Sequence, residues 1–505
     1  MIDSRSVRKT FALLKAMDGR RGLVAKVISV FALALTLATL LVPNSFAGTV
    51  NLKPGENIPA VVASSPTGTT FQFASGLYRL TTPITPVEGD VFIGAAGRTT
   101  IISGATQLKS FTEEGGRWAA LLQLNHTNPV CSSGPCTCVS GFPACNLTED
   151  LFLDNKVLQR VTELSAVASG KWYWDRNAGV IYVAGNPAGH DVEVSTASEA
   201  FVGAAGNVTI NGLTIQMFAG EAIRANVEGA QDGRDWLVEN CNIQGAHLAA
   251  ISTGSRMRVL NNTLCGNGKL AIIGNGDSNL IQGNDICDNN YARFYGESGG
   301  AYFSGTSDLV VNGNYVHDNS GIALHTDSGC ENTLYEYNHT ARNNGAGIVH
   351  EISHAAIIRD NVSENDVFIS THTSPAFGSG ILILASDNVQ VYGNTVTNSM
   401  NGITGYQTLR VDSSGVHVLS NLSVHDNVIT QQKGAASGIL VYTKDSHFYP
   451  AVFTNWNNHF DYNTYCLGSS TASSFDWQLT SVPVTIWRHA YGQDAHSTLS
   501  CATKP

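Results

Sequence analysis

Asparagine recurs in a fixed setting through the second half of the chain. Each of nine asparagines follows an apolar residue by three positions: Asn240, Asn262, Asn284, Asn314, Asn338, Asn361, Asn394, Asn427 and Asn463. Successive members are separated by a short spacing, as from Asn240 to Asn262, or by a longer one, as from Asn427 to Asn463. β-Rich repeats of this kind are typical of a solenoid whose longer spacings hold loops. The pattern therefore predicts an all-β fold, a parallel β-helix with a short basic coil of roughly 22 to 24 residues.

The asparagines suit the turns between the sheets of such a β-helix. Asn tolerates the left-handed backbone conformation and forms local hydrogen bonds at turns. Stacked from coil to coil, its side-chain amides can bond to one another as a ladder. Cys241 and Cys265 are one basic coil apart, so we expect them one above the other in the core. There they would act as small apolar fillers rather than as a disulfide.

The repeat also divides the chain into parts. Residues 48–104 are interpreted as the N-terminal part of the β-helix, 105–200 as an inserted β-subdomain with a cysteine cluster, 201–470 as the coils that carry the site, and 471–505 as a C-terminal capping tail. Within the insert, an aromatic run at 171–175 and a β-branched run at 180–183 flank a polar turn, which predicts a hairpin. The tail is expected to cover strand edges at the open end of the solenoid.

The N-terminus has the pattern of a secretory signal peptide. Seven Lys and Arg residues precede an uncharged apolar run at 27–42, and small residues follow it. The pattern predicts that residues 1–47 are a signal peptide cleaved after Ala47. The alternative is a signal anchor, but the apolar run is short against the ~20 residues of a spanning helix. We therefore expect a secreted or cell-surface protein, extracellular or periplasmic, that has no membrane segment after cleavage.

Ten cysteines agree with export. Four of them, Cys131, Cys136, Cys138 and Cys145, crowd into one short stretch. In an oxidising compartment they predict two local disulfides, and a four-thiolate zinc site is the alternative. A further pair, Cys466 and Cys501, could tie down the C-terminal tail.

Composition limits the partners of the chain. Charged residues make up 14% and apolar residues 43%, which argues against disorder and against a coiled coil. The formal net charge is −11, and without residues 1–47 the chain keeps 22 basic and 38 acidic residues, a net −16. A chain this acidic repels phosphate backbones, so nucleic acid is not an expected partner. We expect a monomer.

Two acids lie one coil apart. Glu351 follows Asp327 by one basic coil, and the residues before them align, 323–327 against 347–351. Parallel coils stack at roughly 4.8 Å, so carboxylates at matching positions lie about 5 Å apart. That separation suits a retaining glycosidase, in which one carboxylate attacks the anomeric carbon and the other transfers a proton. Like charges so close also raise one pKa, which keeps an acid protonated near neutrality.

Both acidic side chains must face outward to form a site. Alternation places Thr326 and His350 toward the core, together with the apolar residues two positions before them. We therefore expect a bend after the apolar residue to turn the two acids outward. Outward carboxylates on a solenoid are often merely solvated, and a stacked acidic pair can bind Ca²⁺. Apart from this option, no cofactor and no metal site is expected.

Polar and aromatic neighbours strengthen the hypothesis of a sugar site around the two acids. Imidazoles beside carboxylates can hold hydroxyl groups or shuttle protons, and aromatic rings offer stacking faces to sugars. The candidates for substrate binding are Glu297, His325, His350, His354 and Tyr302. The alternative interpretation of the aromatic residues is packing of a loop.

The sequence around these residues resembles a known group of proteins. The motifs are Glu-Ser-Gly-Gly at 297–300, Gly-Asn-Tyr-Val-His-Asp-Asn at 313–319, Thr-Asp at 326–327 and Gly-Ile-Val-His-Glu-Ile-Ser at 347–353. They resemble secreted right-handed parallel β-helix proteins of carbohydrate metabolism, among them the β-helix glycoside hydrolases of the β-xylosidase, α-fucosidase and xylanase families. The resemblance implies a right-handed, pectate-lyase-like solenoid. It also implies Asp327 as nucleophile and Glu351 as acid/base.

The chain departs from that group at two positions that bear on the sugar. Related chains often carry Trp before the Thr-Asp pair, where this chain has His325, and Lys after the Gly-Gly pair, where it has Ala301 and Tyr302. The specificity is therefore expected to differ. Three loops determine the specificity, and their sequences do not indicate a particular sugar: residues 285–305, 366–380 and 400–420.

Two other functions remain open at this point. A polysaccharide lyase or epimerase on a uronate polymer shares the fold, but it needs a base for the C5 proton and a cation or Ca²⁺ for the uronate. Lys and Arg are sparse around Asp327. A non-catalytic, glycan-binding surface protein is the third possibility, because solenoids often serve as rigid platforms. All three would take an oligosaccharide or polysaccharide as partner.

Overall fold

The structure is a computed structural model that describes residues 47–124, 137–227, 233–367, 374–413, 415–441, 450–469 and 473–501. The chain separates into two compact units, residues 1–47 and residues 48–505. The segment predicted to be a signal peptide lies outside the described residues except for Ala47. Among the described residues, the structure has no helix with the length and apolar character that a membrane crossing requires.

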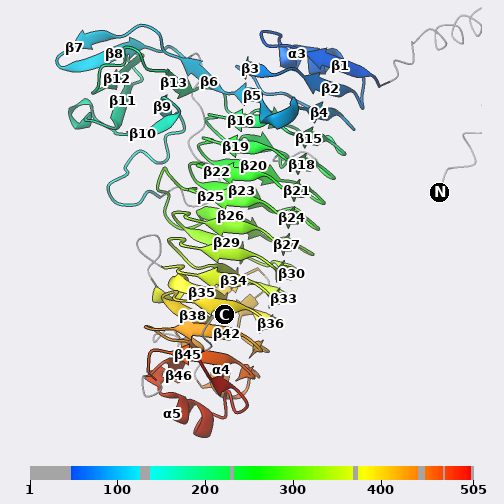
Figure 1. Cartoon of the computed structure of the whole chain (residues 1–505), viewed down its shortest axis with the longest axis vertical. Helices are drawn as coiled ribbons and strands as arrows, with labels where there is room; N and C mark the ends of the chain where they lie inside the picture. The colour runs from blue at the N-terminus through cyan, green and yellow to red at the C-terminus, as the bar shows by residue number, and fades with distance from the viewer. Residues whose placement is uncertain are drawn as a thin grey trace, which may run out of the picture. The chain divides into compact units, whose positions relative to one another are not determined.

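Apart from a segment that forms its own sheet, the described residues from Gly48 on form a right-handed parallel β-helix with three long sheets, as predicted (Figure 1). Sheet 1 runs in the order β1 (Thr49–Leu52), β2 (Thr70–Phe73), β4 (Val91–Ile93), β15 (Thr209–Asn211), β18 (Leu237–Glu239), β21 (Arg258–Leu260), β24 (Leu280–Gln282), β27 (Val310–Asn312), β30 (Glu331–Glu336), β33 (His354–Arg359), β36 (Asp387–Tyr392), β41 (Ser423–His425) and β44 (His459–Asp461). Its neighbouring strands pair in parallel, one coil after the next.

The second strand of each coil lies in sheet 2. Its order is β3 (Gly76–Arg79), β5 (Thr100–Ser103), β16 (Thr214–Gln216), β19 (Asn242–Gln244), β22 (Thr263–Cys265), β25 (Asp285–Cys287), β28 (Tyr315–His317), β31 (His339–Ala341), β34 (Val362–Glu364), β37 (Thr395–Thr397), β42 (Val428–Gln431), β45 (Thr464–Leu467) and β48 (Thr498–Leu499). A short, sharp turn separates most of these strands from those of sheet 1.

The third strand of each coil lies in sheet 3, which carries the two acids. Its order is β14 (Phe201–Val202), β17 (Ile223–Arg224), β20 (Ala249–Thr253), β23 (Leu270–Gly274), β26 (Gly299–Ser304), β29 (Ile322–Asp327), β32 (Ile348–Glu351), β35 (Ser379–Leu384), β38 (Asn401–Gln407), β43 (Ser437–Val441), β46 (Phe475–Trp477) and β47 (Thr480–Val482). Apolar residues stack along its inner face, as in the register of Ala301, Leu324, Ile348 and Ile381. The core therefore runs along the axis of the solenoid.

An asparagine ladder fixes the turns between sheets 1 and 2. Each buried amide donates to the side-chain oxygen of the next, from Asn262 through Asn284, Asn314, Asn338, Asn361, Asn394 and Asn427 to Asn463. The prediction is confirmed for these eight, but it is wrong for Asn240, whose exposed amide bonds to Asn211 instead. Cys241 occupies the rung position, because its backbone N–H donates to the Asn262 side chain.

The cysteines give three disulfides among the described residues. Cys138–Cys145 and Cys466–Cys501 are confirmed, while Cys131 and Cys136 lie outside the described residues. Because the sulfurs of Cys138 and Cys145 are bonded to each other, a zinc site that uses all four thiolates is excluded. Three disulfides agree with an oxidising, extracellular environment.

The prediction for Cys241 and Cys265 is confirmed for Cys241 as a free, buried core residue and is wrong for Cys265 and for the stacking of the two. Cys241 is free and buried, whereas Cys265 forms a disulfide with Cys287 between adjacent coils. The register explains this, because Cys265 ends β22 opposite Cys287 at the end of β25. Cys241 lies in the turn before β19 and so does not stack with Cys265.

The segment between β5 and β14 forms a separate eight-stranded sheet. Its order is β6 (Ala105–Gln107), β13 (Val192–Ser195), β9 (Leu151–Leu153), β10 (Lys156–Arg160), β11 (Lys171–Asp175), β12 (Val180–Val183), β8 (Arg117–Leu121) and β7 (Thr112–Glu114). We call residues 105–195 the insert. The predicted hairpin is confirmed as β11 paired antiparallel with β12. The insert leaves the solenoid after β5 of sheet 2 and rejoins it before β14 of sheet 3, and β5 still pairs directly with β16 of the next coil.

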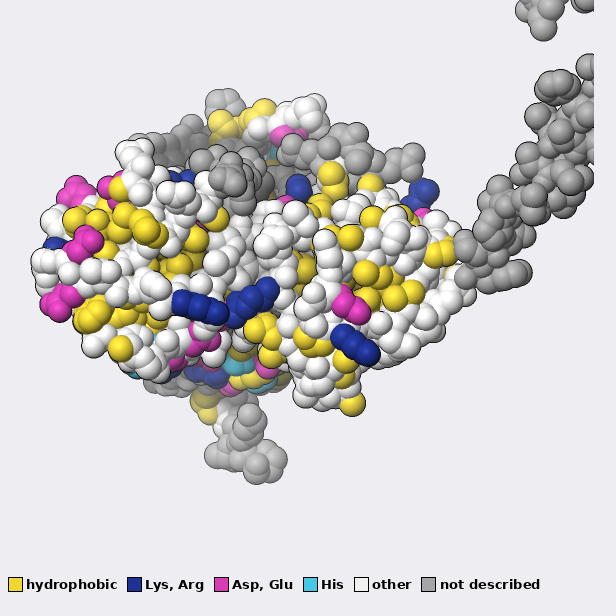
Figure 2. Space-filling model, turned by 90° about the horizontal axis from the view of Figure 1, so that it is seen from above, with side chains coloured by type: hydrophobic (Ala, Val, Ile, Leu, Met, Phe, Trp, Pro, Cys, Tyr) yellow, Lys and Arg dark blue, Asp and Glu magenta, His cyan; other side chains and the backbone are white. Residues whose placement is uncertain are grey.

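Both ends of the solenoid core are covered. Helix α3 (Ile58–Ser64) places Ile58 and Val62 on the first coils. At the other end, α4 (Ala451–Thr454), α5 (Val484–His489) and the aromatic side chains of Phe460, Trp477 and Trp487 join the same core. The short 3₁₀ turns are η1 (Ala96–Arg98), η2 (Leu164–Ala166) and η3 (Pro375–Gly378). Figure 2 shows basic and acidic side chains in small, separate groups on the face seen from above.

Candidate active site

The two acids lie side by side on the outer face of sheet 3. Strand β29 runs unbroken to Asp327, and the pairing of Thr326 with His350 places Asp327 alongside Glu351 at the end of β32. Strict alternation turns Leu324 and Thr326 inward, so Asp327 points outward without any irregularity. The expected bend is therefore wrong, and regular strand geometry presents both carboxylates to the same face.

The carboxylates are close together and shielded. Atoms of His325, Asp327 and Glu351 that could ligate a metal all lie within 4.8 Å of one another. Asp327 is 8% exposed and Glu351 is 4% exposed. The Tyr302 hydroxyl donates a hydrogen bond to Asp327 Oδ2 at 3.0 Å, and His325 Nε2 lies 3.2 Å from Glu351 Oε2. Within the described residues, Asp327 Oδ1 is buried without a hydrogen-bond partner.

Burial and mutual repulsion perturb the protonation of this group. Burial raises the pKa of Asp327, and the negative charge of Glu351 adds to the effect while His325 opposes it. Burial alone would lower the pKa of His325, but the hydrogen bond and charge of Glu351 outweigh it and raise that pKa. Burial and the charge of Asp327 also raise the pKa of Tyr302. Perturbed titratable groups in hydrogen-bond contact with one another are typical of sites of general acid and base catalysis.

Arg410 completes the group and was missed by the sequence analysis. It lies in a two-stranded hairpin, β39 (Arg410–Asp412) with β40 (Gly415–His417), in the connection between β38 and β41. Its guanidinium contacts Glu351 Oε1 and is 39% exposed. The residue falls in loop 400–420, where 59 residues separate it from Glu351 and no repeat places it. Only the folded connection brings this cation to the pair.

Glu297 also belongs to the group. It lies in the turn before β26 and is partly buried, and its charge interacts with those of Asp327, His325 and Glu351. Burial raises the pKa of Glu297, the nearby Lys269 ammonium opposes the rise, and Asp327 adds to it. A third carboxyl group, that of Glu297, therefore interacts electrostatically with the pair and with His325.

Tyr302 contributes differently from the expectation. Its hydroxyl is bonded to Asp327, and its ring meets the His325 ring edge-on with centroids 5.2 Å apart. Tyr302 is mostly buried, at 9% exposure, so it contributes its hydroxyl group to the site and not a ring face for stacking on a sugar.

Two predicted substrate-binding histidines lie elsewhere. His350 is 0% exposed and points into the solenoid, where its Nδ1 lies 2.8 Å from the Thr326 hydroxyl. Burial lowers its pKa to about 3, with help from His354 and His325, so it stays neutral. Its prediction as a substrate ligand is wrong, because alternation faces it inward. His354 begins β33 in sheet 1 and pairs with Asp387, outside the group around Asp327.

The side chains around the pair can be compared with the ligands that a Ca²⁺ ion requires. His325, Asp327 and Glu351 have the spacing of a metal site, but Ca²⁺ prefers oxygen ligands in larger number. A cation here would also meet the Arg410 guanidinium on Glu351. The residues present therefore fit a resident Ca²⁺ poorly.

Comparison with known proteins places the fold. A family model described as a right handed beta helix region matches residues 225–396. No curated protein matches the sequence. A solved structure of XylC in complex with xylose has a TM-score of 0.64 and 16% identity, covering 83% of both chains. A mannuronic acid specific polysaccharide family 6 lyase from human gut microbiota has a TM-score of 0.47 and 11% identity, covering 90% of this chain and 92% of that one.

A third comparison is the A-module of the Azotobacter vinelandii mannuronan C-5 epimerase AlgE4. Its TM-score is 0.42 at 10% identity, covering 88% of this chain and 92% of that one. At such identities the shared feature is the architecture. The chain is a right-handed parallel β-helix protein.

Proposed function

We propose that the protein is a secreted or cell-surface glycoside hydrolase that acts as a monomer and cleaves with retention of anomeric configuration. The observation that carries the proposal is the pair of carboxylates, Asp327 and Glu351, whose facing atoms lie within 4.8 Å on adjacent coils. Retaining enzymes hold their two carboxyl groups roughly 5–5.5 Å apart, whereas inverting enzymes need about 6.5–9.5 Å to fit a water between them. Carboxyl oxygens this close favour retention over an inversion that needs a water between the two groups.

The reaction uses each carboxyl group twice. One carboxylate attacks the anomeric carbon as the bond from that carbon to the leaving oxygen breaks, and the other carboxyl group gives its proton to that oxygen. The second group then takes a proton from water, whose oxygen displaces the enzyme from the anomeric carbon. Burial of both groups excludes bulk water from the pair before the sugar enters.

Two observations disagree about which acid is the nucleophile and which transfers the proton. The resemblance implies Asp327 as nucleophile and Glu351 as acid/base. The charges favour the reverse order, because Arg410 and His325 both face Glu351, while the pKa of Asp327 is raised by burial. A 2-fluoro glycoside that traps the covalent intermediate labels the attacking residue, and peptide mass spectrometry identifies it. Retention is expected from either order.

The test replaces each acid by its isosteric amide. We expect Asp327→Asn and Glu351→Gln each to lower kcat/KM on aryl glycosides by about 10²- to 10⁴-fold, the contribution of a positioned acid or base. Xylosides come first in the panel, because XylC was solved with xylose. Glu364→Gln is the matched control, since that acid pairs with His339 on sheet 2. Full activity of both site variants would refute the proposal.

One observation favours a second candidate, a lyase or epimerase acting on a uronate. Arg410 places a partly exposed cation beside the pair, where it could neutralise a sugar carboxylate. Such a reaction gives an unsaturated product that absorbs in the ultraviolet, or a C5 epimer, from a uronate polymer. Either product, with no hydrolysis of neutral glycosides, would replace the hydrolase assignment. Glycan binding without turnover by a panel of substrates would instead indicate a binding protein.

A further inference from the structure

The turn that carries Glu297 is also the place where the insert meets the solenoid. We call residues 290–298, which lead into β26, the Glu297 turn. Residues 137–139 of the insert run antiparallel to it, with Cys138 opposite Phe294. The Val139 N–H donates to the Arg293 carbonyl at 2.9 Å, and the Tyr295 N–H donates to the Thr137 carbonyl at 2.7 Å. The insert therefore adds backbone pairing directly before Glu297.

The paired segment belongs to a loop that is closed and anchored. We call residues 137–145 the disulfide loop, because the Cys138–Cys145 bond closes it. The carbonyl of Cys145 accepts a hydrogen bond from His247 Nε2–H at 2.8 Å. His247 lies in the solenoid, between β19 and β20, and is buried. The disulfide loop is thus fastened to the solenoid at its far end as well as at the Glu297 turn.

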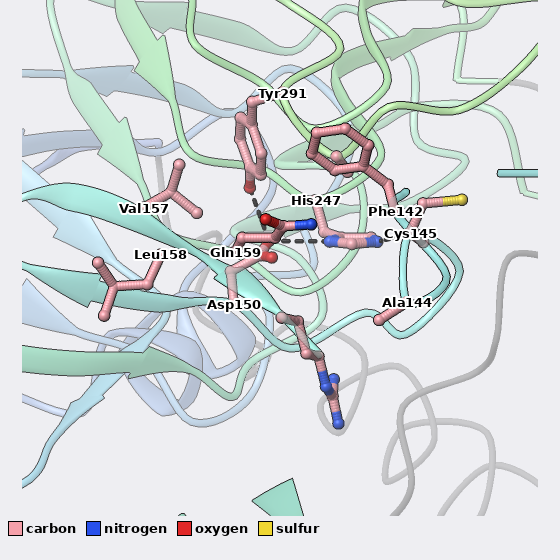
Figure 3. A pocket seen from close by; sticks show the side chains of 11 residues that line it. Phe142, Ala144, Cys145, Asp150, Val157, Leu158, Gln159, His247 and Tyr291 are labelled. Carbon is pink, nitrogen blue, oxygen red and sulfur yellow. Dashed lines mark hydrogen bonds and ion pairs between the residues drawn. The ribbon is translucent and has the colours of Figure 1, made fainter. Parts of the chain in front are cut away.

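A buried ion pair strengthens this junction. His247 Nδ1 lies 2.8 Å from Asp150 Oδ2, and the Tyr291 hydroxyl donates to the same oxygen at 2.6 Å (Figure 3). Since the Cys145 carbonyl and the Asp150 carboxylate only accept, both ring nitrogens carry hydrogens and the imidazole is charged. Burial alone would lower the pKa of His247, but the charge and hydrogen bond of Asp150 outweigh it and raise that pKa. Tyr291 links this pair to the start of the Glu297 turn.

The Glu297 turn is also held by its own hydrogen bonds and by the next coil. The Asn290 amide donates to the Phe294 carbonyl at 3.0 Å and to the Ser298 hydroxyl at 2.9 Å within the turn, and to the Ser320 carbonyl of the next coil at 2.7 Å, and its oxygen accepts the Phe294 N–H. The Lys269 ammonium lies 5.6 Å from the centre of the Phe294 ring and attracts Glu297. The remaining space at the junction is a cavity of about 150 Å³ lined by both parts (Figure 3).

From these contacts we infer that the insert contributes to the function of the candidate active site. The disulfide loop holds the Glu297 turn from the outside, and so positions the Glu297 carboxyl group toward Asp327 and Glu351, where it binds sugar hydroxyls. The inference rests on the proposed function. An insert with no role in the site would not need backbone pairing and a hydroxyl contact to one short turn, nor a buried ion pair to the solenoid beside it. Glu297 thus acts on substrate, and Cys138, Cys145 and Tyr291 are positioning residues.

The test loosens the junction without touching the carboxylate pair. In the double variant Cys138→Ser/Cys145→Ser, we expect KM for an aryl glycoside to rise at least about tenfold with a smaller change in kcat, the loss of a hydrogen bond between a charged group and substrate. The matched control, Cys265→Ser/Cys287→Ser, opens a disulfide on sheet 2 and should leave KM unchanged. Tyr291→Phe keeps the ring, removes the contact to Asp150, and should raise KM in the same direction.

A double-mutant cycle separates positioning from general damage. Glu297→Gln should raise KM in the otherwise unchanged protein, but it should add little once Cys138 and Cys145 are replaced, because both changes act on the same contact with substrate. Fully additive effects, or an unchanged KM in both the double variant and Tyr291→Phe, would overturn the inference. Thermal unfolding of each variant identifies any that fails to fold, and Tyr291→Phe then decides. If the Asp327 and Glu351 variants are themselves fully active, the proposed function has failed instead.

Discussion

The substitution Asp150→Asn gives a direct measure of the junction between insert and solenoid. It keeps the shape of the side chain but removes the negative charge that faces His247. His247 is 1% exposed and Asp150 is 4% exposed, so water cannot take over the lost contact. The imidazolium is then left unpaired in the interior.

The expected loss is large for a single substitution. Removing one partner of a buried ion pair costs about 3–5 kcal/mol, because the other charge stays desolvated. The Tyr291 hydroxyl can still donate to the amide oxygen of the variant. The weakening of this hydrogen bond adds only about 1 kcal/mol to the loss, which is the difference between a bond to a charged group and a bond to a neutral one. We therefore expect the free energy of unfolding to fall by about 4–6 kcal/mol where His247 is protonated.

The loss should depend on pH with a defined sign. The folded-state pKa of His247 is raised above its ordinary value of 6.5. The ion pair therefore contributes fully below that value, and its contribution fades as pH rises through the folded-state pKa. Asp150→Asn should destabilise the protein strongly at about pH 6 and much less at about pH 9, because the neutral imidazole no longer needs a counter-charge.

Urea unfolding followed by tryptophan fluorescence measures this difference. Trp172 and Trp174 lie in the core of the insert and report on it. The matched control is Asp154→Asn, which removes an exposed partner of His190 and should leave the unfolding midpoint unchanged. An unchanged midpoint for Asp150→Asn at pH 6, or an equal loss at both pH values, would refute the charged junction.

Four further outcomes are expected. Asn338→Ala breaks the ladder and leaves a buried backbone N–H and C=O unpaired, so it should cost about 2–6 kcal/mol in urea unfolding; a loss below about 1 kcal/mol would contradict the ladder's role. Tyr302→Phe removes a hydrogen bond that lowers the pKa of Asp327, so the limb of the pH–rate profile that Asp327 sets should move to higher pH: the acidic limb if Asp327 is the nucleophile, the basic limb if it is the proton donor. Two unmoved limbs would count against the contact. Cys466→Ser/Cys501→Ser should lower the melting temperature, with a loss of about 2–4 kcal/mol in the free energy of unfolding; an unchanged melting temperature would show that the tail is held without this disulfide. A chelator should leave activity unchanged; activity that is lost with the chelator and recovered with Ca²⁺ would show that a metal is needed.

The solenoid could be predicted because its determinants repeat locally. The ladder asparagines and the apolar residue before each recur once per coil, so a single sequence displays the register many times over. The error at Asn240 shows the limit of the pattern. It has the right apolar residue three positions earlier, yet the chain turns one residue later and places Cys241 on the rung.

The site could be predicted only as far as the coil repeat reaches. Asp327 and Glu351 occupy equivalent positions on adjacent coils, so their spacing was sufficient to pair them. His350 was misplaced because proximity in sequence was given more weight than alternation, which faces it inward. Arg410 comes from a connection with no repeat, so no pattern in the sequence could join it to Glu351.

The stereochemistry of the first product tests the central claim most directly. Proton NMR of an aryl glycoside reaction, recorded before mutarotation, shows the anomer that leaves the enzyme. A pair held within 4.8 Å predicts the same anomer as the substrate, and its loss in Asp327→Asn and Glu351→Gln. Release of the opposite anomer, or of an unsaturated sugar, would contradict the account.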